Sequence, residues 1–199
     1  MAKAKPVTNL DPQAPLQANV CKIARVRLEE LYSWESYVDY PYAIHELHNL
    51  RIAAKRLRYT LELFQDALQG KCDSLIQEMV QLQEELGALH DSDVIIALLR
   101  LCLGSQTAGT GYQQALARLS RRRKKGTFFL NPDMLAALLN SDAPLSADQR
   151  KGLELFLQYG QQRREEQYLA FRQHWQQLQA RDFYREVISL LDSVVEGTV

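Results

Sequence analysis

The segment from His48 to Tyr59, HNLRIAAKRLRY, concentrates side chains that bind anions. Its cationic residues are Arg51, Lys55, Arg56 and Arg58. At about 100° per residue of α-helix, Arg51, Lys55 and Arg58 fall within about 80° of His48, and the leucines fall on the opposite side. The spacing predicts a helix with a cationic stripe about 15 Å long (His48, Arg51, Lys55, Arg58 and Tyr59) opposite a core-facing apolar stripe.

Two interpretations of the cationic stripe compete: a solvated helix face, or a surface that holds an anion. Like charges four residues apart (Arg51 and Lys55) and three apart (Lys55 and Arg58) each destabilise a helix by a few tenths of a kcal/mol, about what an opposite pair would contribute. Only Glu62, four residues after Arg58, is spaced to form an ion pair with a cation of the stripe. Because this repulsion is retained along one stripe, the pattern favours binding of an anion from solution. A phosphate bound beside His48 would also favour its protonated form, so binding is expected to tighten as pH falls.

Two further charges are expected to point inward. Asp93 shares the apolar side of a helix predicted from about 74 to 103, and Arg164 lies in the middle of the apolar stripe of a helix predicted from about 147 to 180. An unpaired inward charge is costly, so the structural interpretation pairs Asp93 with Arg164 or each with a neighbouring helix. The functional interpretation is compatible with this pairing, because an inward carboxylate can orient an arginine for a ligand.

The pattern along the chain is helical, without sustained two-residue alternation, and predicts an all-α antiparallel bundle of long helices in a single compact domain. A disordered lead-in is expected at 1–16 and the helical domain at 17–199, with a helical insertion at about 104–150. Pro41 and the capping-box pairs Ser74/Gln77 and Ser146/Gln149 are expected near helix starts. The predicted helices are about 17–38, 41–70, 74–103, two short ones inside the insertion, 147–180 and 182–194.

Composition predicts an intracellular protein without a membrane-spanning segment. Lys plus Arg and Asp plus Glu are each 24, so the net charge of zero gives no reason to expect nucleic acid or membrane as a partner. The three cysteines are widely spaced, which argues against a disulfide framework and a zinc knuckle. The N-terminus has no apolar signal core, and the longest apolar run, 94–103, is too short to cross a bilayer. A cytoplasmic location is therefore expected.

Two motifs together closely resemble the CHAD domain, the conserved histidine α-helical domain. HNLRIAAKRLRYTLELF is similar to its His-x-x-Arg helix, and LQEELGALHDSDVIIALL is similar to its Leu-Gly-x-x-Arg-Asp-x-Asp-Val segment. The matching residues are His48, Arg51, Lys55, Arg56, Arg58 and Tyr59 in the first motif, and Leu86, Gly87, Asp91, Asp93 and Val94 in the second. The resemblance covers about 42–103 strongly and 153–190 more weakly.

The resemblance implies a helical module that binds inorganic polyphosphate on a basic surface, often in proteins that associate with polyphosphate granules. The expected ligand-binding residues are His48, Arg51, Lys55, Arg56, Arg58, Tyr59, Arg164 and Arg25, with Asp91 and Asp93 as orienting acids. The run at 121–125 would extend the surface. The chain departs from the family in two ways: it lacks a second His-x-x-Arg after residue 60, and His90 replaces the arginine of the second motif. A homodimer would restore a two-part surface.

Two other functions remain open. A cationic stripe attracts any phosphate polymer, so nonspecific nucleic-acid binding is the first alternative, although no helix-turn-helix signature is evident. A phosphate-ester or metal-dependent hydrolase is the second. HELH at 45–48 is not a metalloprotease motif, His90-Asp91 lacks the spaced partners of a phosphohydrolase, and Glu46 falls opposite His45 and His48. We therefore expect no catalytic residue, no metal and no cofactor.

Overall fold

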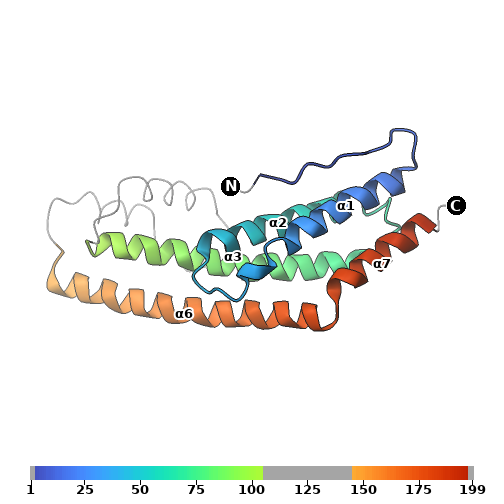
Figure 1. Cartoon of the computed structure of the whole chain (residues 1–199). Coiled ribbons are helices and arrows are strands. Elements are labelled where there is room, and N and C mark those ends of the chain that lie inside the picture. Colours follow the sequence, from blue (N-terminus) through green and yellow to red (C-terminus); the bar gives the residue numbers. More distant parts are fainter. Residues whose placement is uncertain (1–2, 105–144, 197–199) are drawn as a thin grey trace. The chain divides into compact units, whose positions relative to one another are not determined.

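The computed structural model describes residues 3–104 and 145–196, and every regular element in these ranges is helical, which confirms the all-α fold (Figure 1). A single 3₁₀ turn lies at Glu35–Tyr37. The α-helices are α1 (Leu16–Tyr32), α2 (Ile44–Leu63), α3 (Asp73–Cys102), α6 (Ala147–Ala180) and α7 (Phe183–Glu196).

The chain divides into two compact units. The first unit comprises Met1–His90 and Glu166–Val199, and the second comprises Asp91–Glu165. The divisions fall inside α3 and inside α6, so both long helices contribute to each unit. A single helical domain at 17–199 stays a prediction.

The start of α6 follows from the predicted capping box. The backbone N–H of Ser146 donates to Oε1 of Gln149 at 3.0 Å, and the backbone N–H of Gln149 donates to Oγ of Ser146 at 3.2 Å. These reciprocal bonds satisfy donors that a helix N-terminus leaves without partners. The predicted helix at 147–180 is confirmed at both ends, and the helix predicted at 74–103 is shifted by one residue.

The bounds predicted for the first two helices are wrong, because turns interrupt them. Pro41 does not open α2; it occupies the second position of a turn closed by the N–H of Ala43 and the carbonyl of Tyr40 at 3.1 Å. Proline favours this position because its φ is preset. The helix predicted to reach Gly70 ends at Leu63, and Gln69 and Gly70 adopt φ values of 56° and 67°, which a helix cannot contain.

The core of the first unit lies between the apolar faces of its helices. α1 packs against α2 and α7. The predicted apolar stripe of α2 is buried: Leu50, Ala54, Leu57 and Leu61 are at most 1% exposed. The largest fully buried side chains are Trp175, Phe171, Phe183, Leu28, Leu31, Leu50, Leu57, Leu61, Leu68, Leu75, Met79 and Leu82. Burial of this stripe turns the opposite face of α2 away from the core.

The chain before α1 forms no helix or strand in residues 3–15. It is bonded to α1: Nζ of Lys22 donates to the carbonyl of Asn9 at 3.2 Å, and Nδ2 of Asn19 donates to the carbonyl of Asp11 at 2.7 Å. No helix in the described part of the chain is long and apolar enough to span a membrane. The two short helices predicted inside the insertion, and the basic run at 121–125, lie outside the described residues.

Candidate anion-binding site

The cationic stripe lies on one face of α2 in the first unit. Lys55 is exposed, Tyr59 is 49% exposed, and Arg51 is 9% exposed, close to the core. His48 and Arg58 are half-buried. The stripe thus changes along its length from a partly covered end at His48 and Arg51 to an open end at Lys55 and Tyr59.

A face of α3 lies along this stripe. Nη1 of Arg58 donates to Oε1 of Gln83 at 3.4 Å, although this bond is long. Nε of Arg51 lies 3.4 Å from where a Cβ on Gly87 would stand. The contacts continue with His90, whose ring centroid is 4.3 Å from that of His48.

Gln83, Gly87 and His90 are four and three residues apart, so they share one face of α3. Their partners on α2 follow in the reverse order, as expected for neighbouring helices that run antiparallel. We call these three residues the α3 wall. The second motif contains all three residues, but the sequence did not predict that they face the stripe, because contacts between α2 and α3 depend on how the two helices pack. None of the three side chains is acidic.

The aromatic ring of Tyr59 holds two cations of the stripe. Nζ of Lys55 lies 5.2 Å from the ring centroid, and Cζ of Arg58 lies 5.6 Å from it. Such cation–π contacts orient a cation without neutralising it. Nε of Arg58 also donates to Oε1 of Glu62 at 2.7 Å, which leaves the guanidinium other N–H donors for an anion.

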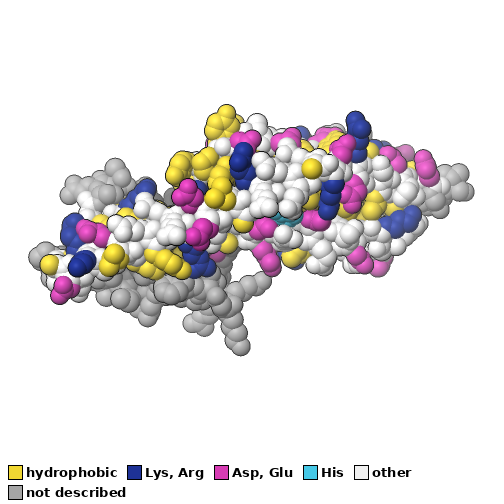
Figure 2. Space-filling model, turned by 90° about the horizontal axis from the view of Figure 1, so that it is seen from below, with side chains coloured by type: hydrophobic (Ala, Val, Ile, Leu, Met, Phe, Trp, Pro, Cys, Tyr) yellow, Lys and Arg dark blue, Asp and Glu magenta, His cyan; other side chains and the backbone are white. Residues whose placement is uncertain are grey.

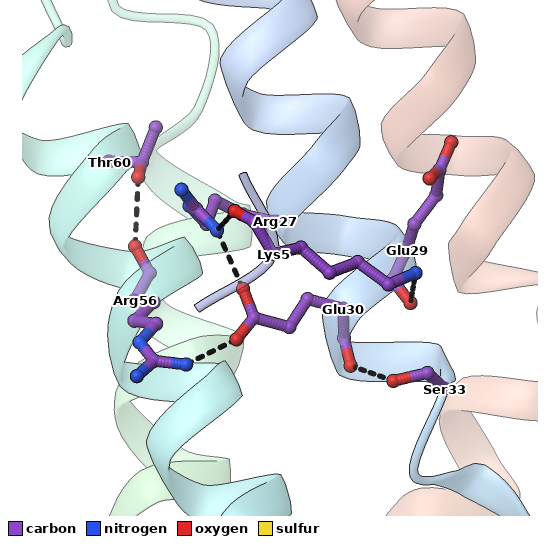
Figure 3. A network of polar contacts seen from close by, with 7 residues as sticks. All are labelled: Lys5, Arg27, Glu29, Glu30, Ser33, Arg56 and Thr60. Carbon is purple, nitrogen blue, oxygen red and sulfur yellow. Dashed lines mark hydrogen bonds and ion pairs between the residues drawn. The ribbon is translucent and has the colours of Figure 1, made fainter. Parts of the chain in front are cut away.

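Arg56 points toward α1. Its guanidinium pairs with Glu30, whose carboxylate also accepts a hydrogen bond from Nη1 of Arg27 at 2.7 Å (Figure 3). The side chain of Glu30 is only 4% exposed. Arg27 donates in addition to the carbonyl of Lys5 at 2.9 Å. The network joins α2, α1 and the N-terminal segment, and it places Arg56 apart from the α3 wall.

We expect Glu30→Gln to lower the free energy of unfolding by about 2 kcal/mol, because it removes the charge that two guanidiniums share. Chemical denaturation would measure the loss. Glu29→Gln is the matched control, since Glu29 is exposed and its recorded bond uses the backbone carbonyl. Equal stability of the two variants would contradict a structural role for the Glu30 network.

The remaining predicted residues lie on helices other than α2. Arg25 on α1 forms an ion pair with Asp192 on α7. Asp91, Asp93 and Arg164 belong to the second unit. There, Nε of Arg164 donates to Oδ1 of Asp93 at 2.7 Å, and their side chains are 7% and 8% exposed. The predicted pairing of Asp93 with Arg164 is confirmed.

Burial raises the pKa of the Asp93 carboxyl, and the hydrogen bond and charge of Arg164 act in the opposite direction. The free-energy cost of desolvating the Asp93 carboxylate therefore exceeds the stabilisation that this carboxylate gains from Arg164, as is common for buried ion pairs. An orienting role for Asp91 and Asp93 toward a ligand remains a prediction.

Charges of both signs share the molecular surface. Figure 2 shows Lys and Arg side chains interspersed with Asp and Glu side chains over the face that it presents. This mixture agrees with a net charge of zero. On that face, the cations do not form one continuous positive patch.

Comparison with known proteins gives one match. Residues 10–100 match the family model described as CHAD domain. The matched range includes the whole cationic stripe and the α3 wall, whereas Arg164 and helices α6 and α7 lie beyond it. No curated protein and no solved structure matches the chain.

Proposed function

We propose that this chain, whose residues 10–100 match the family model described as CHAD domain, binds inorganic polyphosphate along the cationic stripe of α2 and performs no chemistry on it. The ligand-binding residues in this proposal are His48, Arg51, Lys55, Arg58 and Tyr59. Binding would recruit the protein to polyphosphate in the cytoplasm, including polyphosphate granules.

One observation carries the proposal. The stripe faces Gln83, Gly87 and His90 on α3, none of which has a negative charge. A helix face that served only solvation would gain stability from acids placed among its cations. Instead, Lys55 and Arg58 are held by an aromatic ring, and Glu62 is the carboxylate that Arg58 contacts among residues 3–104 and 145–196. Such a surface suits an anion that arrives from solution.

The chemistry of the side chains matches a phosphate polymer without bases. Arg51 and Arg58 have planar guanidiniums that can donate two parallel hydrogen bonds to one phosphate, and Lys55 supplies a compact charge. A row about 15 Å long spans several phosphates of a flexible chain. Recognition of this kind needs neither base-edge donors nor a stacking platform.

The deciding experiment is a competition at fixed salt concentration between polyphosphate and single-stranded DNA of matched total charge. We expect polyphosphate to displace labelled polyphosphate at a much lower concentration than DNA does. The triple variant Arg51→Ala/Lys55→Ala/Arg58→Ala is expected to lose this preference and to weaken polyphosphate binding by more than about tenfold.

A charge-matched control separates the stripe from net charge. The variant Lys71→Ala/Lys151→Ala/Arg185→Ala also removes three cations, and all three side chains are exposed and none belongs to the stripe. It is expected to bind nearly as the unchanged protein does. Equal losses in the two triple variants would contradict the proposal, and so would equal displacement by DNA and polyphosphate.

Nonspecific nucleic-acid binding is the second candidate, and exposed Tyr59 favours it. An aromatic ring flanked by cations is a surface on which a base can stack. The DNA arm of the competition tests this candidate directly. Incubation with polyphosphate and with nucleotides, followed by an assay for released phosphate, tests the proposed lack of catalysis, and gel filtration tests the proposed homodimer.

A further inference from the structure

A carboxylate lies at the end of the cationic stripe, near the C-terminus of α2. At about 100° per residue, Glu62 falls about 40° from His48 around the helix axis, between Lys55 and Arg58. Oε1 of Glu62 accepts a hydrogen bond from Nε of Arg58 at 2.7 Å. The side chains of Glu62 and Arg58 are 37% and 25% exposed, so both reach solvent. The open end of the stripe therefore holds a fixed negative charge beside its cations.

The ring of Tyr59 belongs to the same end of the stripe. It is 49% exposed, with Nζ of Lys55 and Cζ of Arg58 at 5.2 and 5.6 Å from its centroid. A nucleobase can stack on such a ring while its phosphates reach the cations. Glu62 follows Tyr59 by three residues, so the carboxylate and the ring share one face of α2. A nucleotide stacked on Tyr59 would therefore place its phosphates near Glu62 as well.

The two kinds of phosphate polymer differ in their freedom along the stripe. In a nucleic acid each base is covalently joined to the backbone, so stacking on Tyr59 fixes where the neighbouring phosphates lie. Inorganic polyphosphate has no base, and its chain can bind elsewhere along the stripe without approaching Glu62. One negative charge about 4 Å from a phosphate lowers affinity about fivefold in water. This repulsion therefore acts more strongly on nucleic acid than on polyphosphate.

We propose that Glu62 is a specificity-determining residue of the anion site, which disfavours nucleic acid at Tyr59 and leaves polyphosphate bound along the rest of the stripe. This inference rests on the proposed function, since polyphosphate is the preferred anion. Its physical basis is a repulsive group placed against the competing ligand, rather than a new contact with the preferred one. It explains how an exposed ring between two cations is compatible with a site that selects a polymer without bases.

The test measures the affinities of polyphosphate and of single-stranded DNA of matched total charge, at fixed salt concentration, for the unchanged protein and for Glu62→Gln. Glutamine keeps an oxygen that can accept the bond from Nε of Arg58, and it removes the charge. We expect DNA to bind about fivefold more tightly to Glu62→Gln, and polyphosphate to gain less than about twofold. The gain for DNA should shrink as the salt concentration rises, because salt screens exposed charges.

Asp66→Asn is the control for net charge. Asp66 is exposed and lies beyond Leu63, the last residue of α2, and its replacement removes the same charge as Glu62→Gln does. This variant should change both affinities by a similar factor of less than about two. Glu62 is exposed as well, so neither substitution removes a buried side chain from the core.

A second background tests the role of the ring. Tyr59→Leu removes the stacking surface and keeps an apolar side chain at that position. In this background, Glu62→Gln should raise the affinities for DNA and for polyphosphate by the same factor, because a ring no longer holds a base beside residue 62. A preferential gain for DNA that survives the loss of the ring would overturn the inference.

The remaining outcomes separate this inference from the proposed function. Absence of polyphosphate binding to the unchanged protein would overturn the proposed function itself. If polyphosphate binds but Glu62→Gln changes the affinities for DNA and polyphosphate equally, the function stands and the inference is overturned. Equal effects of Glu62→Gln and Asp66→Asn would overturn the inference in the same way, because net charge alone would then explain the change.

Discussion

Replacement of Asp93 by alanine is expected to lower the free energy of unfolding by about 3–5 kcal/mol, the largest single effect that the structure predicts. The change removes the carboxylate that binds Nε of Arg164 at 2.7 Å and leaves the guanidinium in a site where its side chain is 7% exposed. Chemical denaturation followed by circular dichroism would measure the loss.

An exposed pair in the same unit is the matched control. Arg150 and Glu154 lie 3.7 Å apart on α6, and their side chains are 54% and 52% exposed. Glu154→Ala should change the free energy of unfolding by no more than about 0.5 kcal/mol, because surface ion pairs contribute little. A similar cost for Asp93→Ala and Glu154→Ala would show that burial does not set the energetics of the Asp93–Arg164 pair.

A double variant asks whether this buried pair stabilises the fold at all. Since burial raises the pKa of Asp93 despite Arg164, the ion pair does not recover the full cost of its own desolvation. Asp93→Leu/Arg164→Met should therefore be much more stable than Asp93→Ala, by about 2 kcal/mol or more. If the double variant is as unstable as the single one, the charges have a structural role that apolar packing cannot replace.

The stability of the first unit is expected to fall as pH rises through the pKa of His174. This buried imidazole on α6 contacts two carboxylates of α3: its Nδ1 lies 2.8 Å from Oε2 of Glu85, and its Nε2 lies 3.0 Å from Oε2 of Glu78. A neutral ring has one N–H and could donate to only one of them. The geometry therefore favours an imidazolium between two carboxylates.

The sign of this dependence follows from the shifts. The hydrogen bond to Glu85, assisted by Glu78, raises the pKa of His174 in spite of burial. A raised folded-state pKa gives stabilisation that is complete below the unfolded pKa of about 6.5 and is lost as pH rises through the folded value. Burial acts to raise the pKa of Glu78, but the hydrogen bonds from His174 and Arg181 lower it, so its contribution is lost when pH falls through that lowered value.

His174→Gln tests this assignment. At about pH 6 the variant should be less stable by about 2 kcal/mol, the usual contribution of hydrogen bonds to charged groups. The difference from the unchanged protein should shrink as pH rises through the raised pKa of His174, because the unchanged protein then loses its imidazolium. His45→Gln is the control, since His45 is 72% exposed. Parallel stability curves for the unchanged protein and His174→Gln would contradict the prediction.

Helical periodicity was sufficient to predict much of the fold. It predicted the 147–180 helix with its capping box, the burial of the α2 leucines and the inward positions of Asp93 and Arg164. Each of these depends on interactions within about one turn, or on which side of one helix is apolar. The turn at Pro41 was missed because proline suits a helix start and a turn equally well.

Two arginines near the end of α2 show what the sequence could not decide. Arg56 and Arg58 lie about 80° on either side of His48 around the helix axis, so periodicity treats them alike. Their surroundings differ: Arg56 pairs with buried Glu30 on α1, whereas Arg58 reaches Gln83 on α3. The contact of His48 with His90, 42 residues later in the chain, depends in the same way on how α2 and α3 pack.

By itself, the sequence determined the helical class of the fold, the apolar and cationic faces of α2, and the two motifs that lie within residues 10–100, the part of the chain that matches the CHAD domain family model. The tertiary structure decided which cations serve the fold and which face the α3 wall. The physical reason is one of range: helix formation and amphipathicity depend on neighbours three and four residues apart, whereas the partner of each charge is set by helix packing between distant segments.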